Sequence, residues 1–278
     1  MSHAAPSPAT ANPVPAPGAS SPNLIVAILA LAGISVALMQ TLVIPIIPQL
    51  PSLLRSSASD AAWAITATLL AGAVATPLAG RLGDMIGKRP VLLASLALMV
   101  LGSVVCGLSD SLVPMVTGRV LQGLAAGVIP LGISLMRDVL PAERLGTSIA
   151  LMSASLGVGG ALGLPAAAVI AQNLDWHALF WVSAGLGAVV LALVAFLIPA
   201  SPNRTGGRLD IVGAVGLSAT LISLLLAVSK GADWGWTSGL TVGLLVAAVV
   251  LAWPGARGSC GPLSRWSISG SRPGARSW

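Results

Sequence analysis

Long stretches without a charged side chain recur along the chain, and they constrain its fold more than any other feature. The first runs from Asn23 to Leu54 and the next from Ala61 to Gly80. A helix of about 20 residues, rising about 1.5 Å per residue, crosses the apolar core of a membrane. By this criterion we expect eight spans, near residues 24–46, 61–80, 91–109, 112–136, 146–171, 178–200, 210–229 and 237–253. The spans must be helices, because a backbone in lipid has to satisfy its own hydrogen bonds.

The composition agrees with an all-α membrane protein. Hydrophobic residues make up 55% of the chain and charged residues only 8%, whereas a soluble domain has about 25% charged residues. The net charge of +6 would suit nucleic acid, but the basic residues lie in short loops between spans, so no nucleic-acid partner is expected. Cys106 and Cys260 form neither a disulfide framework nor a metal site.

The distribution of basic residues over the loops predicts the orientation. Seven lie in one set of alternate loops and two in the opposite set, and positive loops stay in the cytoplasm. We therefore expect a multi-pass protein of the cell membrane with a cytoplasmic N-terminus. The two sets are Arg81, Lys88, Arg89, Arg137, Arg144, Arg204 and Arg208 against Arg55 and Lys230.

The hydrophilic segment at residues 80–90 separates two uncharged stretches, which predicts a tight loop at the membrane surface. The segment contains Gly80, Leu82, Gly83, Asp84, Gly87, Lys88 and Arg89. In this order and spacing these residues resemble the signature that transporters of the major facilitator superfamily carry between their second and third helices. The resemblance implies a gating loop that latches two halves of a transporter, and an ordinary positive loop is the alternative. Asp84 is suited to cap a helix N-terminus or to pair with a basic residue.

Arg119 is the one charge placed deep in a predicted span. Such a charge costs at least about 2.5–3.5 kcal/mol, so we expect it to face the protein interior and to be functional. Snorkelling towards the outer surface is the alternative. The spacing of Arg119, Gln122 and Gly123 resembles the family's fourth-helix motif, which implies a role in proton coupling.

The fifth span carries Gly159, Gly163 and Pro165. These residues resemble, imperfectly, the antiporter motif of the drug-exporting branch, because the proline lies one place late. The alternative is a generic small-residue packing face, and both interpretations predict a helix that Pro165 kinks and that packs closely on a neighbour. Further on, residues 209–213 and 231–236 resemble the start and end of helix seven in the fourteen-span drug:proton antiporters.

Two positions depart from that branch. Gln40 stands where an aspartate is common, and Thr68 stands where a tyrosine is expected. Gln40 and Thr66 are weak candidates for the lining of a substrate cavity. No carboxylate lies in the middle of a span, so the group that carries the coupled proton is not evident in this chain.

Together these features predict four segments. Residues 1–22 form a disordered tail, 23–200 a major-facilitator-type six-helix N-terminal bundle, and 201–253 a linker with two further transmembrane helices. Residues 254–278 change composition abruptly, which indicates either a disordered tail or out-of-frame translation after a frameshift.

The predicted function is proton-driven export of drugs or other small amphipathic compounds, with no cofactor beyond the proton gradient. The resemblance ends after an eighth span, so a second chain is a possible source of the other half. The alternative is a truncated, transport-inactive fragment that acts at most as a membrane interaction partner. An intramembrane enzyme is not supported, because no embedded cluster of His, Asp, Glu or Cys is present.

Overall fold

The computed structural model describes residues 21–199 and 211–258 of the chain. Most of the predicted N-terminal tail, the linker with Arg204 and Arg208, and most of the C-terminal tail therefore lie outside the described residues. The chain divides into two units, residues 1–209 and residues 210–278.

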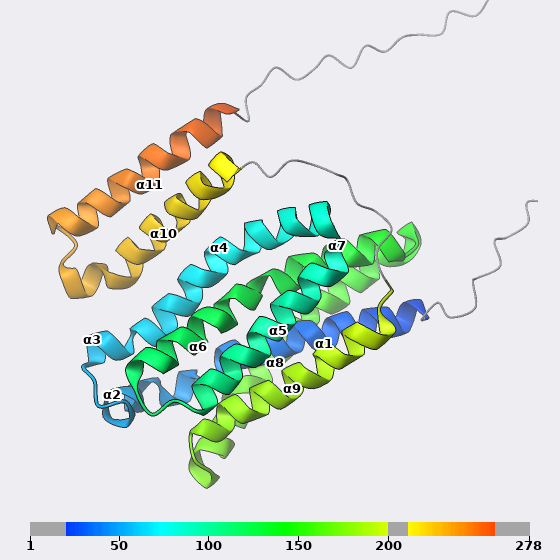
Figure 1. The fold of residues 1–278 in the computed structure, drawn as a ribbon, viewed down its shortest axis with the longest axis horizontal. Helices are drawn as coiled ribbons and strands as arrows, with labels where there is room; N and C mark the ends of the chain where they lie inside the picture. Colours follow the sequence, from blue (N-terminus) through cyan, green and yellow to red (C-terminus); the bar gives the residue numbers. More distant parts are fainter. Residues whose placement is uncertain (1–20, 200–210, 259–278) are drawn as a thin grey trace, which may run out of the picture. The chain divides into compact units, whose positions relative to one another are not determined.

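All regular secondary structure in the described part of the chain is helical, with no strand (Figure 1). The first unit contains α1 (Pro22–Thr41), the 3-10 helix η1 (Ile44–Gln49), α2 (Leu50–Leu53), α3 (Ala58–Ala61), α4 (Trp63–Ile86), α5 (Lys88–Gly107), α6 (Leu112–Leu124), η2 (Ala125–Gly127), α7 (Val128–Val139), α8 (Ala142–Asn173) and α9 (His177–Leu197). The second unit contains α10 (Ile211–Trp234) and α11 (Gly239–Gly258).

Seven helical segments of the described chain are long and apolar enough to cross a membrane. They are Pro22–Leu53, Ala58–Ile86, Lys88–Gly107, Leu112–Val139, Ala142–Asn173, His177–Leu197 and Gly213–Trp234. The eighth predicted span corresponds to α11, whose apolar part, Gly239–Ala252, is shorter than these seven. The all-α membrane fold is confirmed.

The predicted loop at residues 80–90 is wrong in its length. α4 continues to Ile86 and α5 begins at Lys88, so Gly87 alone separates the two helices. Gly87 has a φ of 110°, a backbone conformation that side chains with a Cβ rarely adopt. The charged residues that suggested a loop are compatible with helix, so α4 extends past the uncharged stretch until the glycine ends it.

The predicted fourth span also differs from one regular helix. It consists of α6 and α7, joined by the 3-10 turn η2. At this turn the helix passes very close to α4. A methyl group at Gly123 would overlap the backbone of Thr68, and one at Gly127 would overlap the side chain of Ala79. The glycines therefore let the two helices approach closely.

The six long helical segments of the first unit pack as a bundle. α1 lies against α8 and α9, α5 against α6 and α9, and α4 against α6. Figure 1 shows α5 and α9 running alongside each other. The largest cluster of buried side chains includes Leu29, Leu92, Leu96, Leu131 and Leu135, whereas many other large apolar residues are exposed on the outer faces. Outward apolar side chains are what a helix needs in contact with lipid.

α10 and α11 pack side by side as a hairpin (Figure 1). Near its turn, Lys230 is buried and its Nζ lies 3.0 Å from Oδ2 of Asp233. Gly235 has a φ of 87°, and a methyl group at Gly231 would lie 2.9 Å from the ring of Trp236. The pairing of its charge explains how Lys230 is tolerated inside an apolar hairpin.

Candidate functional site

The predicted gating residues lie at the end of the bundle where α4 meets α5. Lys88 is the first residue of α5, and its Nζ lies 2.7 Å from Oδ2 of Asp138 at the end of α7. The same ammonium donates a hydrogen bond to the carbonyl of Ser134, at 3.1 Å. Both charged side chains are nearly buried, with 10% and 11% of their surfaces exposed. Lys88 therefore ties the start of α5 to the last turns of α7.

Arg89 makes a second connection at this end. Its Nη2 donates a hydrogen bond of 2.5 Å to the carbonyl of Ala195, near the end of α9. Its Nε is buried without a hydrogen-bond partner. The two adjacent basic residues thus hold the start of α5 to two different helices.

The other residues of the signature take distinct positions. Asp84 lies in the last turn of α4 and the N-cap of α5 is Gly87, so Asp84 does not cap that helix, and its pairing with a basic residue stays a prediction. A methyl group at Gly83 would lie 2.6 Å from the side chain of Leu131, whereas Gly80 has open space around it. Gly83 is therefore a point of close contact between α4 and α7, and Gly80 is not.

Arg119 is buried, with only 3% of its surface exposed, and it lies at the centre of a polar network. Its Nη1 donates a 2.7 Å hydrogen bond to Oε1 of Gln122, and Nε2 of Gln122 donates at 2.9 Å to Oγ of Ser103. Its Nε donates at 3.1 Å to the carbonyl of Ala64. Arg119 therefore faces the protein and does not snorkel, and the network connects α6 to α4 and α5.

The approach of α5 and α6 makes this network possible. A methyl group at Gly102 would lie 2.5 Å from the carbonyl oxygen of Gly118, and one at Gly118 would lie 2.7 Å from the carbonyl oxygen of Gly102. Only residues without a Cβ fit at such a crossing. The close crossing brings Ser103 within reach of Gln122.

A cavity of about 320 Å³ opens beside Arg119. Its wall comes from α1, η1, α4, α6 and η2, and we call it the Arg119 pocket. The lining residues are Gln40, Thr41, Val43, Ile44, Ile47, Ile65, Thr68, Leu69, Gly72, Arg119, Gly123 and Ala126. Gln40 lines this pocket as expected, whereas Thr66 is buried and lines neither cavity described here.

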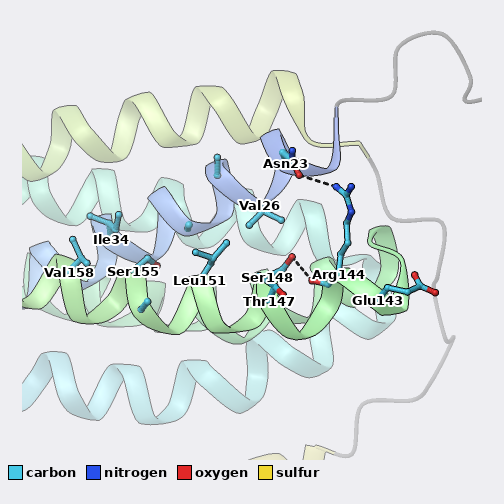
Figure 2. A pocket seen from close by; sticks show the side chains of 13 residues that line it. Asn23, Val26, Ile34, Glu143, Arg144, Thr147, Ser148, Leu151, Ser155 and Val158 are labelled. Atoms are coloured by element: carbon cyan, nitrogen blue, oxygen red, sulfur yellow. Dashed lines mark hydrogen bonds between the residues drawn. The ribbon is translucent and has the colours of Figure 1, made fainter.

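A second, more open groove of about 760 Å³ runs between α1 and α8 (Figure 2). Apolar side chains such as Val26, Ile34 and Leu151 line most of its length. At its end Nη1 of Arg144 donates a 3.1 Å hydrogen bond to Oδ1 of Asn23, which Figure 2 shows as a dashed line. We call it the α1–α8 groove.

α1 and α8 touch through two of the glycines predicted from the antiporter-like motif. A methyl group at Gly159 would lie 2.8 Å from the carbonyl oxygen of Ile34, and one at Gly163 would overlap the hydroxyl of Thr41. Gly157 and Gly160, on the same helix, have open space around them. α8 stays helical through Pro165. This geometry fits close packing of α8 on α1, which both interpretations of the motif predict.

At the opposite end of the bundle His177 connects two loops. Its Nδ1 pairs with Asp175, and its Nε2 lies 3.1 Å from the carbonyl oxygen of Ser109 and 3.5 Å from Oδ1 of Asp110. The backbone N–H of His177 donates to Asp175 at 2.8 Å, and this bond, followed by the side-chain bond, lowers the pKa of Asp175. The side chain of His177 therefore links the loop before α9 to the loop between α5 and α6.

Sequence patterns did not identify several partners in these sites. Ser103 is an uncharged residue in an apolar span, Asp138 stands at a helix end beside Arg137, and Thr41 lies in an uncharged stretch. Nothing in their local sequence separates them from neighbours that make no such contacts. Only the rotation of each helix about its axis brings them to the sites.

The fold defines a multi-pass, all-helical membrane protein with a polar network and a pocket inside a six-helix bundle. The sequence profile of the Major Facilitator Superfamily matches residues 29–272. The chain belongs to the Major Facilitator Superfamily.

Relatives and solved structures agree with this assignment. The chain is 33% identical to the uncharacterized MFS-type transporter Rv1877 of Mycobacterium tuberculosis, over 82% of this chain and 33% of that protein. It is 33% identical to the tetracenomycin C resistance and export protein of Streptomyces glaucescens, over 77% of this chain and 40% of that protein. The chain thus spans between a third and about half of the length of such relatives.

Solved transporters share the fold. The POT family transporter PepTSo superposes with a TM-score of 0.61 at 16% identity, covering 84% of this chain and 52% of that one. The xylose transporter XylE of E. coli superposes in its inward open conformation with a TM-score of 0.59 at 15% identity, covering 86% and 69%.

Proposed function

We propose that this chain forms the N-terminal half of a secondary transporter that exports drugs or other small amphipathic compounds by proton antiport. The names of two relatives support export, one a tetracenomycin C resistance and export protein and the other multidrug resistance protein 3 of Bacillus subtilis. The resemblance of its motifs to the fourteen-span drug:proton antiporters supports the coupling. The basic loops favour the cell membrane with a cytoplasmic N-terminus.

The observation that carries the proposal is the Arg119 pocket. It combines an aliphatic wall with a few polar groups, which is the composition that binds an amphipathic small molecule. The bonds from Arg119 to Gln122 and Ala64 hold the guanidinium in one position at the edge of this space. A fixed cation inside the membrane marks a binding or coupling site.

Alternating access requires a second bundle that rocks against the first. We propose that the remaining half, from a longer chain or from a second chain, covers the α1–α8 groove. The connections from Lys88 to Asp138 and from Arg89 to Ala195 stiffen the end of the bundle where the gate is expected. Within the described residues every carboxylate lies at a helix end or in a loop, so we place the coupled proton in the other half. A membrane potential of about 100 mV supplies about 2.3 kcal/mol per charge moved.

Proteoliposome efflux tests the proposal. The 278-residue chain is reconstituted together with the transporter half that completes it, a neutral fluorescent dye is loaded, and efflux is measured with and without a proton gradient. We expect gradient-dependent efflux that is lost in Arg119→Gln and retained in Thr117→Val, since Thr117 lies exposed on the same helix and bonds only to its own backbone turn. Efflux that is equal with and without the gradient, and equal in the wild type and Arg119→Gln, contradicts the proposal.

The second candidate is a transport-inactive membrane fragment that acts through contacts with other helices. The observation in its favour is that the chain spans only 33% and 40% of two of its relatives. No efflux under any gradient, from a chain that is correctly folded, favours this candidate. Gradient-dependent efflux eliminates it.

A further inference from the structure

The charge of the Arg119 pocket suggests which compounds it binds. Of its lining residues, Arg119 is the only charged one, and Gln40, Thr41 and Thr68 are the polar neutral ones. Ile44, Ile65 and Leu69 are among those that form the apolar wall. The part of the wall that the described residues supply therefore has one positive charge and no negative charge.

The guanidinium of Arg119 has hydrogen-bond donors that its bonds within the protein do not use. It carries more N–H groups than its bonds from Nε to Ala64 and from Nη1 to Gln122 use. Within the described residues no acceptor takes the N–H groups of Nη2. A cation that is 3% exposed and incompletely bonded in an apolar region gains from an acceptor that enters the pocket.

No carboxylate of the described chain offers that acceptor. Asp60 and Asp175 lie near one end of the bundle, and Asp138 and Glu143 near the other. Asp138 is already paired with Lys88. Gln40, the other long polar side chain of the pocket wall, is uncharged.

The α1–α8 groove lacks this property. Its two charged residues, Glu143 and Arg144, have opposite signs and lie together at one end (Figure 2). Arg144 also bonds to Asn23 there. The groove therefore has no net charge with which to discriminate between ligands.

We propose that the Arg119 pocket selects amphipathic organic anions, such as aromatic carboxylates, phenolates or sulfonates, over neutral and cationic compounds with the same apolar body. This inference rests on the proposed function of the pocket as a transport site. The acidic group of the ligand accepts hydrogen bonds from Nη2 of Arg119, and the apolar body packs against Ile44, Ile65 and Leu69. A cationic ligand meets repulsion from Arg119 and no opposite charge.

Direct binding measurements test the selection. The 278-residue chain is placed in nanodiscs of zwitterionic lipid and titrated with two fluorescent probes of one body, anilinonaphthalene sulfonate and neutral phenylnaphthylamine, with empty nanodiscs as blank. We expect the anion to bind about tenfold more tightly than the neutral probe, because charge-assisted hydrogen bonds are about twice as strong as neutral ones. Arg119→Gln should remove this preference, and Arg137→Gln, which removes an exposed arginine from α7, should leave it unchanged.

A second variant guards against misfolding of Arg119→Gln. Gln40 lines the pocket but is exposed, so Gln40→Glu adds a carboxylate to the pocket wall with little effect on packing. It should weaken the anionic probe about tenfold, with no weakening of the neutral probe, because the added charge repels only the anion.

The outcomes separate this inference from the proposed function. Equal binding of both probes, no binding above the blank, or an anion preference that survives both variants overturns the charge selection. Gradient-driven efflux of a neutral dye without any anion preference refutes only the charge selection. Selective binding without efflux refutes only the transport proposal.

Discussion

Nζ of Lys88, the first residue of α5, lies 2.7 Å from Oδ2 of Asp138, one residue before the end of α7. The contact joins residues 50 positions apart in the sequence and spans two helices. Both side chains are about nine-tenths buried, so the charge of Lys88 depends on Asp138 for compensation. Lys88 belongs to the predicted gating motif at the α4–α5 junction. Its pairing with Asp138 gives this motif a structural role in the bundle as well.

Breaking this pair should destabilise the bundle strongly. Asp138→Asn leaves the ammonium of Lys88 nearly buried without its counter-charge, which costs about 3–5 kcal/mol. Denaturant unfolding in detergent, followed by the helical circular dichroism signal, measures the loss. The exposed carboxylate at the same end provides the control, since Glu143→Gln should change stability by less than about 0.5 kcal/mol. Equal losses of unfolding free energy in Asp138→Asn and Glu143→Gln would show that the Lys88–Asp138 pair does not stabilise the bundle.

Two glycines of α8 should respond oppositely to the same substitution. Gly163→Ala places a methyl group on the hydroxyl of Thr41 and should cost about 1–3 kcal/mol through forced separation of α1 and α8. Gly160→Ala meets open space and should be neutral or stabilise by up to about 1 kcal/mol, because alanine favours helix over glycine.

The double variant Thr41→Ala with Gly163→Ala removes the clashing hydroxyl. It should recover part of the stability lost in Gly163→Ala, as measured by thermal unfolding of the purified variants. The close contact between α1 and α8 is refuted if Gly163→Ala and Gly160→Ala lose the same stability. It is also refuted if adding Thr41→Ala to Gly163→Ala recovers none of the lost stability.

The network around Arg119 should behave as one unit. Gln122→Leu removes the acceptor of Arg119 Nη1 and the donor to Ser103, and we expect a loss of about 1–3 kcal/mol. Ser103→Ala removes one acceptor and should cost about 1 kcal/mol. The double variant should cost little more than Gln122→Leu alone, because the bond between the two residues is then already lost. Additive losses in unfolding experiments would contradict a connected network.

Asp175 should give a stability that depends on acidic pH. Its pKa is lowered in the folded protein by the backbone and side chain of His177, so its stabilising effect is complete above the unfolded value of about 3.9. The effect disappears as the pH falls through the lower folded-state pKa. Asp175→Ala should therefore be less stable than the wild type near neutral pH and equal to it at the lowest pH. A difference that stays constant as the solution is acidified would exclude this role.

The sequence by itself determined that the chain is an all-helical membrane protein and where most of its spans lie. The length of an uncharged stretch is a local property, and lipid requires a helix wherever such a stretch crosses the membrane. The order of Gly83, Asp84, Gly87 and Lys88 was likewise enough to indicate the family before the profile match to residues 29–272 confirmed it.

Only the tertiary structure decided which side chains contact one another between the helices. How each helix is rotated against its neighbours determines that Lys88 pairs with Asp138 and that Gln122 bonds to Ser103. The same rotation places Gly163 against Thr41 and leaves open space at Gly160. Helix rotation follows from side-chain packing over the whole bundle, and in spans that are apolar on every side the sequence pattern does not mark one face. The same packing brings Arg119 to a pocket whose described lining residues include no carboxylate.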